Sequence, residues 1–186
     1  MTSRPNRDEI LDSIRGNVQD KNTIKHMLAT EAIMRALAKK LGENEEEWGI
    51  TGLIHDIDVE LVEGDMNSHG KLGADIAQEL GANETMAHAI LCHNEAHGAS
   101  RETKLDKALF CADPLSGLIT AAALVRPDKL SGLTTKAVMK RFREKSFAAG
   151  VKRKQVAQCQ EIGLELEEFI GLGIEAMKGI ASELKL

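Results

Sequence analysis

The sequence predicts an all-α protein, a helical bundle with a C-terminal helical extension. Apolar residues recur at spacings of three and four along almost the whole 186-residue chain, as on amphipathic helices. Valine and isoleucine nowhere form an alternating run bounded by turn residues, so no β-strand is expected. Asparagine, aspartate, threonine and glycine stand where the helices would begin and end. Together these observations predict consecutive helices around one core.

The first two helices are expected over residues 7–18 and 23–41. The first has an apolar face formed by Ile10, Ile14 and Val18. The second should end at Gly42, because glycine readily adopts the left-handed conformation that closes many helices.

The third helix is expected from about Asn44 to residues 55–56. Its first turn is rich in glutamate, which favours the positive end of a helix dipole. A charged, glycine-containing loop over residues 58–68 follows. Two further helices are then predicted over residues 71–80 and 83–93.

The second half of the chain is predicted to begin with a long apolar helix. It should run from about Thr103 to Val125, with a kink or restart at Pro114. The segment 136–154 carries eight basic residues and one acidic residue. Two amphipathic helices are expected at the end of the chain, over residues 152–162 and 164–184.

This organisation divides the chain into two parts. Residues 1–130 are expected to form a metal-binding helical domain. Residues 131–186, which contain the basic segment and the last helices, are expected to pack on that same domain. The length suits one domain with a helical appendage.

The composition argues against several classes of partner. The net charge of -5 gives no overall attraction to a nucleic acid polymer or to an anionic membrane, so neither is expected as a partner. Residues 1–10 lack the apolar stretch of a secretory signal, and no apolar run is expected to span a membrane. The three cysteines are widely spaced and odd in number, which does not indicate a disulfide framework. A cytoplasmic location is expected, and the oligomeric state stays open.

Histidine and aspartate residues provide candidate metal ligands. His55 and Asp56 are adjacent at a predicted helix end, where a nitrogen and an oxygen can turn toward one point. His26 lies on the preceding helix. Asp113 lies in the apolar run 110–114, where a carboxylate is costly unless it is paired or binds a metal.

This ordered set resembles the HD superfamily of metal-dependent phosphohydrolases, which is defined by the pattern His…His-Asp…Asp. The similarity covers about residues 22–125. His69, within the pattern His-x3-Gly-Ala, and the helix-terminal His93 look like the additional ligands of the two-metal members. The resemblance thus implies a ligand set of His26, His55, Asp56, His69, His93 and Asp113 around one or two ions. If two ions bind, Asp56 would bridge them.

The mixed nitrogen and oxygen ligands suit Mn²⁺, Fe²⁺, Zn²⁺, Co²⁺, Ni²⁺ or Mg²⁺ rather than a soft metal. The chain departs from better-known members, because Asp58 stands where many have glycine and the lysine that follows there is absent. Asp58 and Glu60 are candidates for general acid or base catalysis, since either could take a proton from the attacking water or supply one to the leaving group.

The resemblance implies hydrolysis of a phosphate ester of a nucleotide or small metabolite by metal-activated water. Such a phosphorylated substrate needs positive charge around it. The candidates for phosphate contact are Lys71, Lys107, Arg141, Arg143, Lys145 and Arg153.

Three other interpretations remain open. Some two-iron HD proteins are oxygenases that act on cyclitols or organophosphonates; the phosphonate oxygenases use a tyrosine near the first ligand, and this chain has no tyrosine. The domain can also serve as a metal-stabilised binding module without catalysis. Finally, His88 and Cys92 have the spacing of neighbours on a helix and allow a structural zinc site.

Overall fold

The computed structural model describes residues 6–186. Residues 1–5, part of the segment in which no secretory signal is expected, lie outside this range. Every regular element within it is a helix, as the sequence predicts. The α-helices are α1 (Arg7–Asn17), α2 (Lys21–Leu41), α3 (Glu45–Ile54), α4 (Lys71–Glu79), α5 (Glu84–His93), α6 (Lys104–Leu124), α7 (Thr135–Arg143), α8 (Arg153–Val156), α9 (Leu166–Lys178) and α10 (Ala181–Leu184). Two 3₁₀ helices, η1 (Glu95–His97) and η2 (Ala157–Ile162), complete the described elements.

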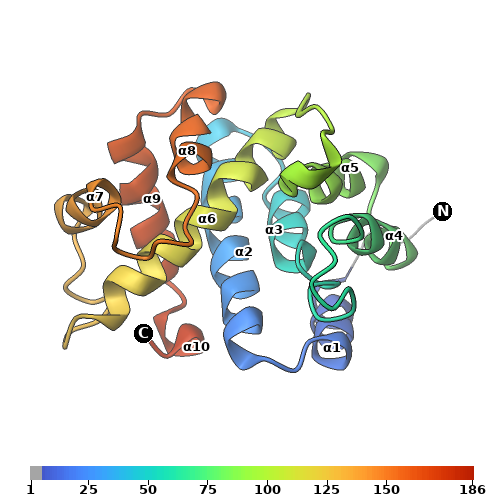
Figure 1. The fold of residues 1–186 in the computed structure, drawn as a ribbon, viewed down its shortest axis with the longest axis horizontal. Helices are drawn as coiled ribbons and strands as arrows, with labels where there is room; N and C mark the ends of the chain where they lie inside the picture. Colours follow the sequence, from blue (N-terminus) through green and yellow to red (C-terminus); the bar gives the residue numbers. More distant parts are fainter. Residues whose placement is uncertain (1–5) are drawn as a thin grey trace.

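Helices α2 and α6 form the centre of the molecule (Figure 1). Helix α6 crosses the face of α2 and also packs against α5, α7, α8 and α9. Helices α3, α4 and α5 lie on one side of this pair, while α7, α8 and α9 lie on the other (Figure 1). Residues 131–186 thereby pack directly on α2 and α6.

Short polar side chains begin most of the longer helices, as the sequence predicts. Asn44 accepts hydrogen bonds from the backbone N–H groups of Glu46 and Glu47 at the start of α3. Thr103 and Asp106 form a reciprocal capping box at the start of α6. These bonds satisfy N–H groups that have no partner within the helix.

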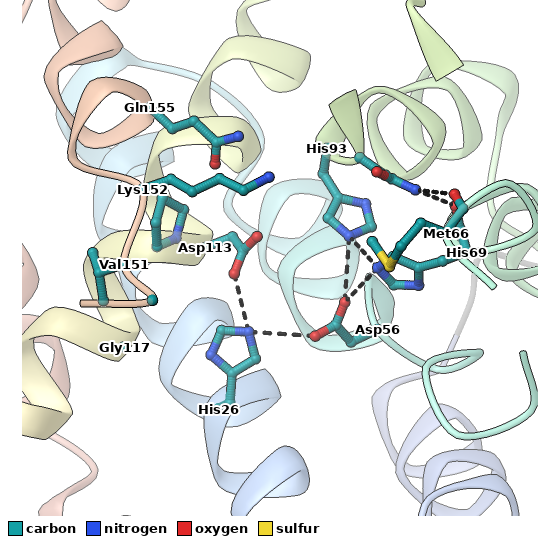
Figure 2. A pocket seen from close by; sticks show the side chains of 13 residues that line it. His26, Asp56, Met66, His69, His93, Asp113, Gly117, Val151, Lys152 and Gln155 are labelled. Carbon is teal, nitrogen blue, oxygen red and sulfur yellow. Dashed lines mark hydrogen bonds and ion pairs between the residues drawn. The ribbon is translucent and has the colours of Figure 1, made fainter. Parts of the chain in front are cut away.

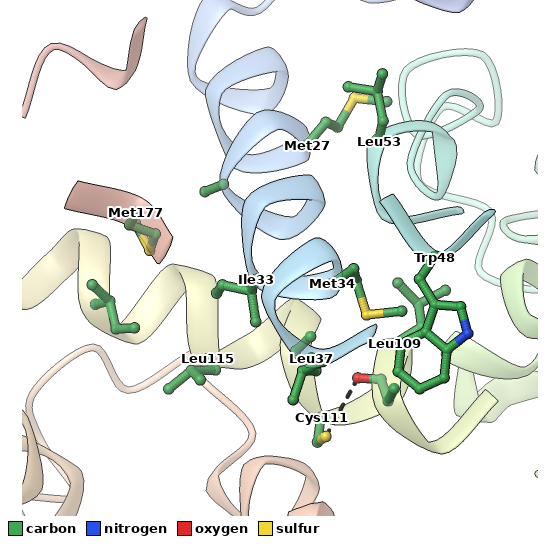
Figure 3. Packing of buried hydrophobic residues seen from close by; sticks show 14 of the residues in the cluster. Met27, Ile33, Met34, Leu37, Trp48, Leu53, Leu109, Cys111, Leu115 and Met177 are labelled. Atoms are coloured by element: carbon green, nitrogen blue, oxygen red, sulfur yellow. Dashed lines mark hydrogen bonds between the residues drawn. The ribbon is translucent and has the colours of Figure 1, made fainter. Parts of the chain in front are cut away.

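One apolar cluster connects the helices of both parts. Met34 of α2, Trp48 of α3 and Leu109 of α6 belong to it (Figure 3). Phe169 of α9 belongs to the same cluster and is fully buried. The three cysteines are free and buried, and Cys111 and Cys159 are part of this cluster.

The last third of the chain is more broken than its periodicity suggests. The predicted helix 152–162 consists of α8 followed by η2, and the predicted helix 164–184 is divided into α9 and α10. Gly179 and Ile180 separate these two, and Ile180 has a non-helical backbone conformation. Helix α6, in contrast, continues through Pro114 without a restart.

Helix α6 is long and apolar enough, by length and composition, to cross a membrane, whereas no such apolar run is expected from the sequence. Within the fold 67% of its most apolar stretch is buried. Core helices of soluble proteins meet the same criterion, so this finding is weak evidence for a membrane span.

Glycines allow α2 and α3 to approach closely. A Cβ atom on Gly52 would lie 2.9 Å from Met34 Cγ and 3.0 Å from the backbone oxygen of Thr30. The backbone of α2 cannot yield as a flexible side chain would. Gly52 therefore sets the distance between α2 and the helix that ends at His55 and Asp56.

We expect Gly52→Ala to destabilise the protein by about 1–3 kcal/mol, the usual cost of overpacking a core. Gly16→Ala is the control, because a Cβ at Gly16 meets nothing within 4 Å. That variant should gain about 0.5–1 kcal/mol from the higher helix propensity of alanine. Urea unfolding of both variants measures the difference, and equal stabilities would contradict the close-packing argument.

Candidate metal centre

Six side chains from five parts of the fold converge on one centre; five of them line a pocket (Figure 2), and His55 is buried behind them next to Asp56. They are the side chains that the HD resemblance implies as metal ligands. His26 comes from α2, and His55 and Asp56 directly follow α3. His69 precedes α4, His93 is the last residue of α5, and Asp113 lies in the middle of α6.

The Asp56 carboxylate joins two groups of these side chains. Its Oδ2 atom lies 3.4 Å from Nε2 of both His26 and His55. Its Oδ1 atom lies 3.5 Å from His69 Nε2 and 3.3 Å from His93 Nε2. Asp113 completes the first group, since its Oδ1 lies 3.1 Å from His26 Nε2. One carboxylate thus faces two neighbouring sets of ligand atoms.

All four histidines turn the same ring nitrogen toward the centre because the other nitrogen, Nδ1, is engaged elsewhere. His55 Nδ1 lies 2.8 Å from the Gly52 carbonyl oxygen, and His93 Nδ1 lies 2.5 Å from that of Ile90. His69 Nδ1 lies 2.8 Å from Asp58 Oδ1, and His26 Nδ1 lies 2.8 Å from the Ser116 hydroxyl. The Ser116 hydroxyl can accept from His26 because its own proton points to the Asp113 carbonyl oxygen, 2.8 Å away. Donation from Nδ1 leaves the Nε2 lone pair free to bind a metal.

Two features of the centre call for a cation. His55 Nε2 is completely buried and has no hydrogen-bond partner among the described residues. The Nε2 atoms of His69 and His93 face each other at 3.1 Å, an arrangement that needs a shared proton or a cation. Imidazole and carboxylate ligands of this kind bind divalent metals, so the residues fit such an ion.

The pKa values of the metal-free centre reflect the same demand for positive charge. Burial alone would lower the pKa of His26, but its hydrogen bonds to Asp113 and Asp56 raise it to about 10. The pKa of His93 likewise rises to about 8 against the effect of burial, because of Asp56. Burial opposes ionisation of Asp56, yet the surrounding imidazoles hold its pKa well below the usual range. Without metal, protons on histidine supply the missing charge.

Asp58 does not occupy the position expected of a general acid or base. It is completely buried, and both carboxylate oxygens already accept hydrogen bonds. Besides His69, the donors are the backbone N–H groups of Gly70 at 2.7 Å and Gly73 at 2.8 Å. Asp58 thus orients His69 and caps α4. Gly73 permits this approach, because a Cβ there would lie 3.2 Å from the carboxylate. This contact gives the His-x3-Gly-Ala pattern a structural reason.

Glu60 also lies away from the position expected of it. Its carboxylate accepts hydrogen bonds from the backbone N–H groups of Gln19 and Asp20, ahead of α2. It does not line the ligand pocket. Its geometry indicates a role in holding the start of α2 against the 55–70 segment.

The proposed phosphate contacts are also not gathered at the pocket, which none of them lines. Arg141 pairs with Glu144 and lies over the Phe147 ring. Lys107 Nζ lies 3.9 Å from Glu161 Oε2. Lys71, Arg143 and Lys145 are exposed on the surface. Arg153 donates to backbone carbonyls of residues 141–151.

The pocket contains residues that were not singled out from the sequence. Its wall includes Met66 and Asn94, and the C-terminal part contributes Lys152 and Gln155. Lys152 belongs to the basic segment, so its charge was visible in the sequence. Which of the eight basic residues faces the pocket depends on the turn at residues 144–152, and the sequence pattern does not determine that turn.

His88 and Cys92 do come together with a third residue, Asp106. His88 Nδ1 lies 3.1 Å from Asp106 Oδ2. The same oxygen accepts from the backbone N–H groups of Glu102 and Thr103, as part of the cap of α6. Capping therefore explains much of this cluster, and the zinc interpretation stays a prediction.

A family model described as "HD domain" matches residues 23–118, more than half of the chain. The chain belongs to the HD domain family. All six side chains of the centre fall within the matched region. HD domains are generally metal-dependent hydrolases that bind divalent ions, and the His and Asp clusters here can hold such an ion.

Curated relatives include several proteins named Ribonuclease Y. That of Sulfurovum sp. (strain NBC37-1) is 26% identical over 174 residues, which cover 89% of this chain and 32% of the relative. That of Lawsonia intracellularis is 30% identical over 104 residues, which cover 56% of this chain and 20% of the relative. The chain thus spans about a third or less of the length of these relatives. No solved structure gives a significant match.

These relatives correct one expectation from the sequence. The net charge was taken to exclude a nucleic acid polymer as a partner, whereas the relatives are named for action on RNA. Net charge is a poor guide here because it averages over the whole surface. A metal centre in a pocket creates its own local field.

We expect Asp58→Asn to weaken binding of an ion at His69 and His93 by about 10–100-fold, the usual effect of losing such a supporting carboxylate. An amide cannot accept from both His69 and the glycine N–H groups, so the His69 ring loses its fixed orientation. An ion at His26, His55 and Asp113 should remain.

Metal titration followed calorimetrically measures both affinities. Glu60→Gln is the control, since Glu60 touches no predicted ligand. Two ions bound by Asp58→Asn as tightly as by the parent would contradict this role.

We expect metal affinity to rise steeply with pH. His26 and His93 have raised pKa values in the metal-free fold, so their protonation stabilises that fold below pH 6.5, and this contribution is lost as pH rises toward about 10 and about 8. A metal must displace these protons, which gives about a tenfold gain in affinity per pH unit for each proton released. Mn²⁺ titrations at pH 6.5 and pH 8 test this. A pH-independent affinity would show that the two histidines do not compete with the ion.

Proposed function

We propose that this protein is a metal-dependent phosphoester hydrolase. The observation that carries the proposal is the Asp56 carboxylate, which faces two sets of imidazole ligands at the floor of an open cavity. Divalent ions at such a centre supply an activated water molecule and neutralise charge on a phosphoryl group. The two-sided ligand arrangement supports a centre of two ions rather than one.

The protein's own residues would each have a defined task. His26, His55 and Asp113 would hold one ion, His69 and His93 a second, and Asp56 would be shared. The Nδ1 hydrogen bonds fix the rings before any ion arrives, which limits the entropy lost on binding. Asp58 and Glu60 have no role in proton transfer in this proposal, because their carboxylates hold backbone N–H groups away from the reacting position.

The cavity limits the size of the reacting group. It has a volume of about 300 Å³, and its lining includes the imidazoles and carboxylates of the predicted ligands. This is near the lower end for small-molecule sites. It suits a phosphoryl group with part of its ester, so we propose a nucleotide or another small phosphorylated metabolite as substrate.

RNA is a second candidate substrate, favoured by a specific observation. The Ribonuclease Y relative from Sulfurovum aligns with 89% of this chain, a stretch well beyond the ligand motif. A short single-stranded segment has the same phosphate chemistry as a nucleotide. Its backbone can enter an open pocket from the surface.

A substrate panel in the presence of Mn²⁺, Co²⁺ or Mg²⁺ tests the proposal. It contains nucleoside phosphates, sugar phosphates, bis(p-nitrophenyl) phosphate and a single-stranded RNA oligonucleotide. Release of phosphate or of shortened RNA supports hydrolysis. Oxygen uptake by the iron-loaded protein with a phosphonate or cyclitol, and no hydrolysis, would instead favour the oxygenase. No turnover of any kind would favour a binding module.

We expect Asp56→Ala to lose bound metal and all activity, because Asp56 contacts both ligand groups. Asp75→Ala is a matched control, since Asp75 is an exposed carboxylate of α4 away from the pocket. Metal content by mass spectrometry is measured beside turnover. An Asp56→Ala protein that keeps its full metal content would overturn the assignment.

A further inference from the structure

The wall of the metal pocket contains two residues that are not among the predicted metal ligands. Lys152 and Gln155 come from the start of α8, far along the chain from the predicted ligands. Figure 2 shows both side chains extending across the pocket near Asp113 and His93. Their chemistry, one cation and one amide, is that of anion recognition.

The Gln155 amide is in an unusual state for a buried group. Only 5% of the residue is exposed, and Nε2 forms no hydrogen bond of normal geometry within the described residues. Buried polar groups are nearly always paired, and an unpaired donor destabilises the fold. Because Gln155 also lines the pocket, this donor is available to an acceptor on a ligand that binds there.

Lys152 already faces an anion at the rim of the pocket. Its Nζ atom lies 3.2 Å from Glu95 Oε2, in an exposed ion pair. Partial burial would raise the pKa of Glu95, but Lys152 and Gln155 together lower it. Glu95 thus pairs with Lys152, while its contact with the Gln155 amide falls short of a hydrogen bond of normal geometry. Because exposed ion pairs are weak, an incoming anion can take its place.

The segment that carries Lys152 and Gln155 is held firmly in position. The Arg153 guanidinium donates to the backbone oxygens of Phe142 at 2.8 Å and Glu144 at 2.9 Å, and it also bonds to Phe147. Further bonds reach Ala148 and Val151 at 3.2 Å. This arrangement folds residues 141–153 into a fixed support, as a precise binding site requires.

We propose that Lys152 and Gln155 form an anion-binding subsite for the phosphate oxygens of the substrate that face away from the predicted metal ligands. Glu95 holds Lys152 when no substrate is bound and releases it to the phosphate. The inference rests on the proposed function and adds the means by which the phosphate is recognised. It applies equally to a free nucleotide and to a phosphate of RNA.

The test measures binding of inorganic phosphate to the metal-loaded protein, by equilibrium dialysis and by the phosphate-dependent rise in Tm. We expect Lys152→Met and Gln155→Leu each to weaken phosphate binding by about tenfold. Lys154→Met is the matched control, an exposed lysine of the same helix that does not line the pocket. It should bind like the parent.

Two further readouts separate recognition from a structural role. Gln155→Leu should have a Tm equal to or above that of the parent, because it removes an unpaired buried donor. Glu95→Gln should bind phosphate about two- to threefold more tightly, because Lys152 loses its competing partner. If Lys152 and Gln155 have only a structural role, Gln155→Leu should lower the Tm and Glu95→Gln should not bind phosphate more tightly.

The outcomes distinguish this inference from the proposed function. If the parent hydrolyses phosphoesters while Lys152→Met and Gln155→Leu bind phosphate like the parent, the subsite is wrong and the function stands. If phosphate binding depends on Lys152 and Gln155 but no ester is hydrolysed, the subsite stands and the function is wrong. Parallel assays with a nucleoside 5′-monophosphate and with a 5′-phosphorylated RNA show which source of phosphate the subsite prefers.

Discussion

The Asp56 carboxylate is the contact on which the rest of the centre depends. Its two oxygens lie within 3.5 Å of ring nitrogens from four histidines, which belong to four separate parts of the chain. A buried carboxylate of this kind is costly without positive charge nearby. The fold provides that charge either as histidine protons or as metal ions.

Helix ends perform most of the positioning. His55 and His93 follow the same rule, since each Nδ1 lies within hydrogen-bond distance of the carbonyl oxygen three residues earlier, that of Gly52 or Ile90. Carbonyl groups in the last turn of a helix lack partners within the helix, so they are available as acceptors. Asp58 serves the opposite end of a helix, since it caps α4 and holds His69 with the same carboxylate. Ordinary capping interactions thus also orient the ligands.

Much of this could be predicted from the sequence, and the failures have identifiable physical causes. The helices, their caps and the six converging side chains follow from local patterns and from an ordered motif. The roles of Asp58 and Glu60 did not follow, because burial and partners up to 41 residues away decide them. The basic residue of segment 136–154 that lines the pocket was not identified from the sequence, for a related reason. Arg153 binds backbone oxygens, and the turn before it points Lys152, rather than Arg141 or Arg143, into the pocket.

The position of Trp48 gives the molecule a built-in optical probe. It is the single tryptophan of a chain without tyrosine, so nearly all near-ultraviolet emission must originate from one indole ring. That ring is buried in α3, the helix that leads directly to His55 and Asp56. His55 follows Trp48 by seven positions, which corresponds to roughly 10 Å along the helix axis. Small movements of α3 as the centre fills should therefore change the fluorescence of the unlabelled protein.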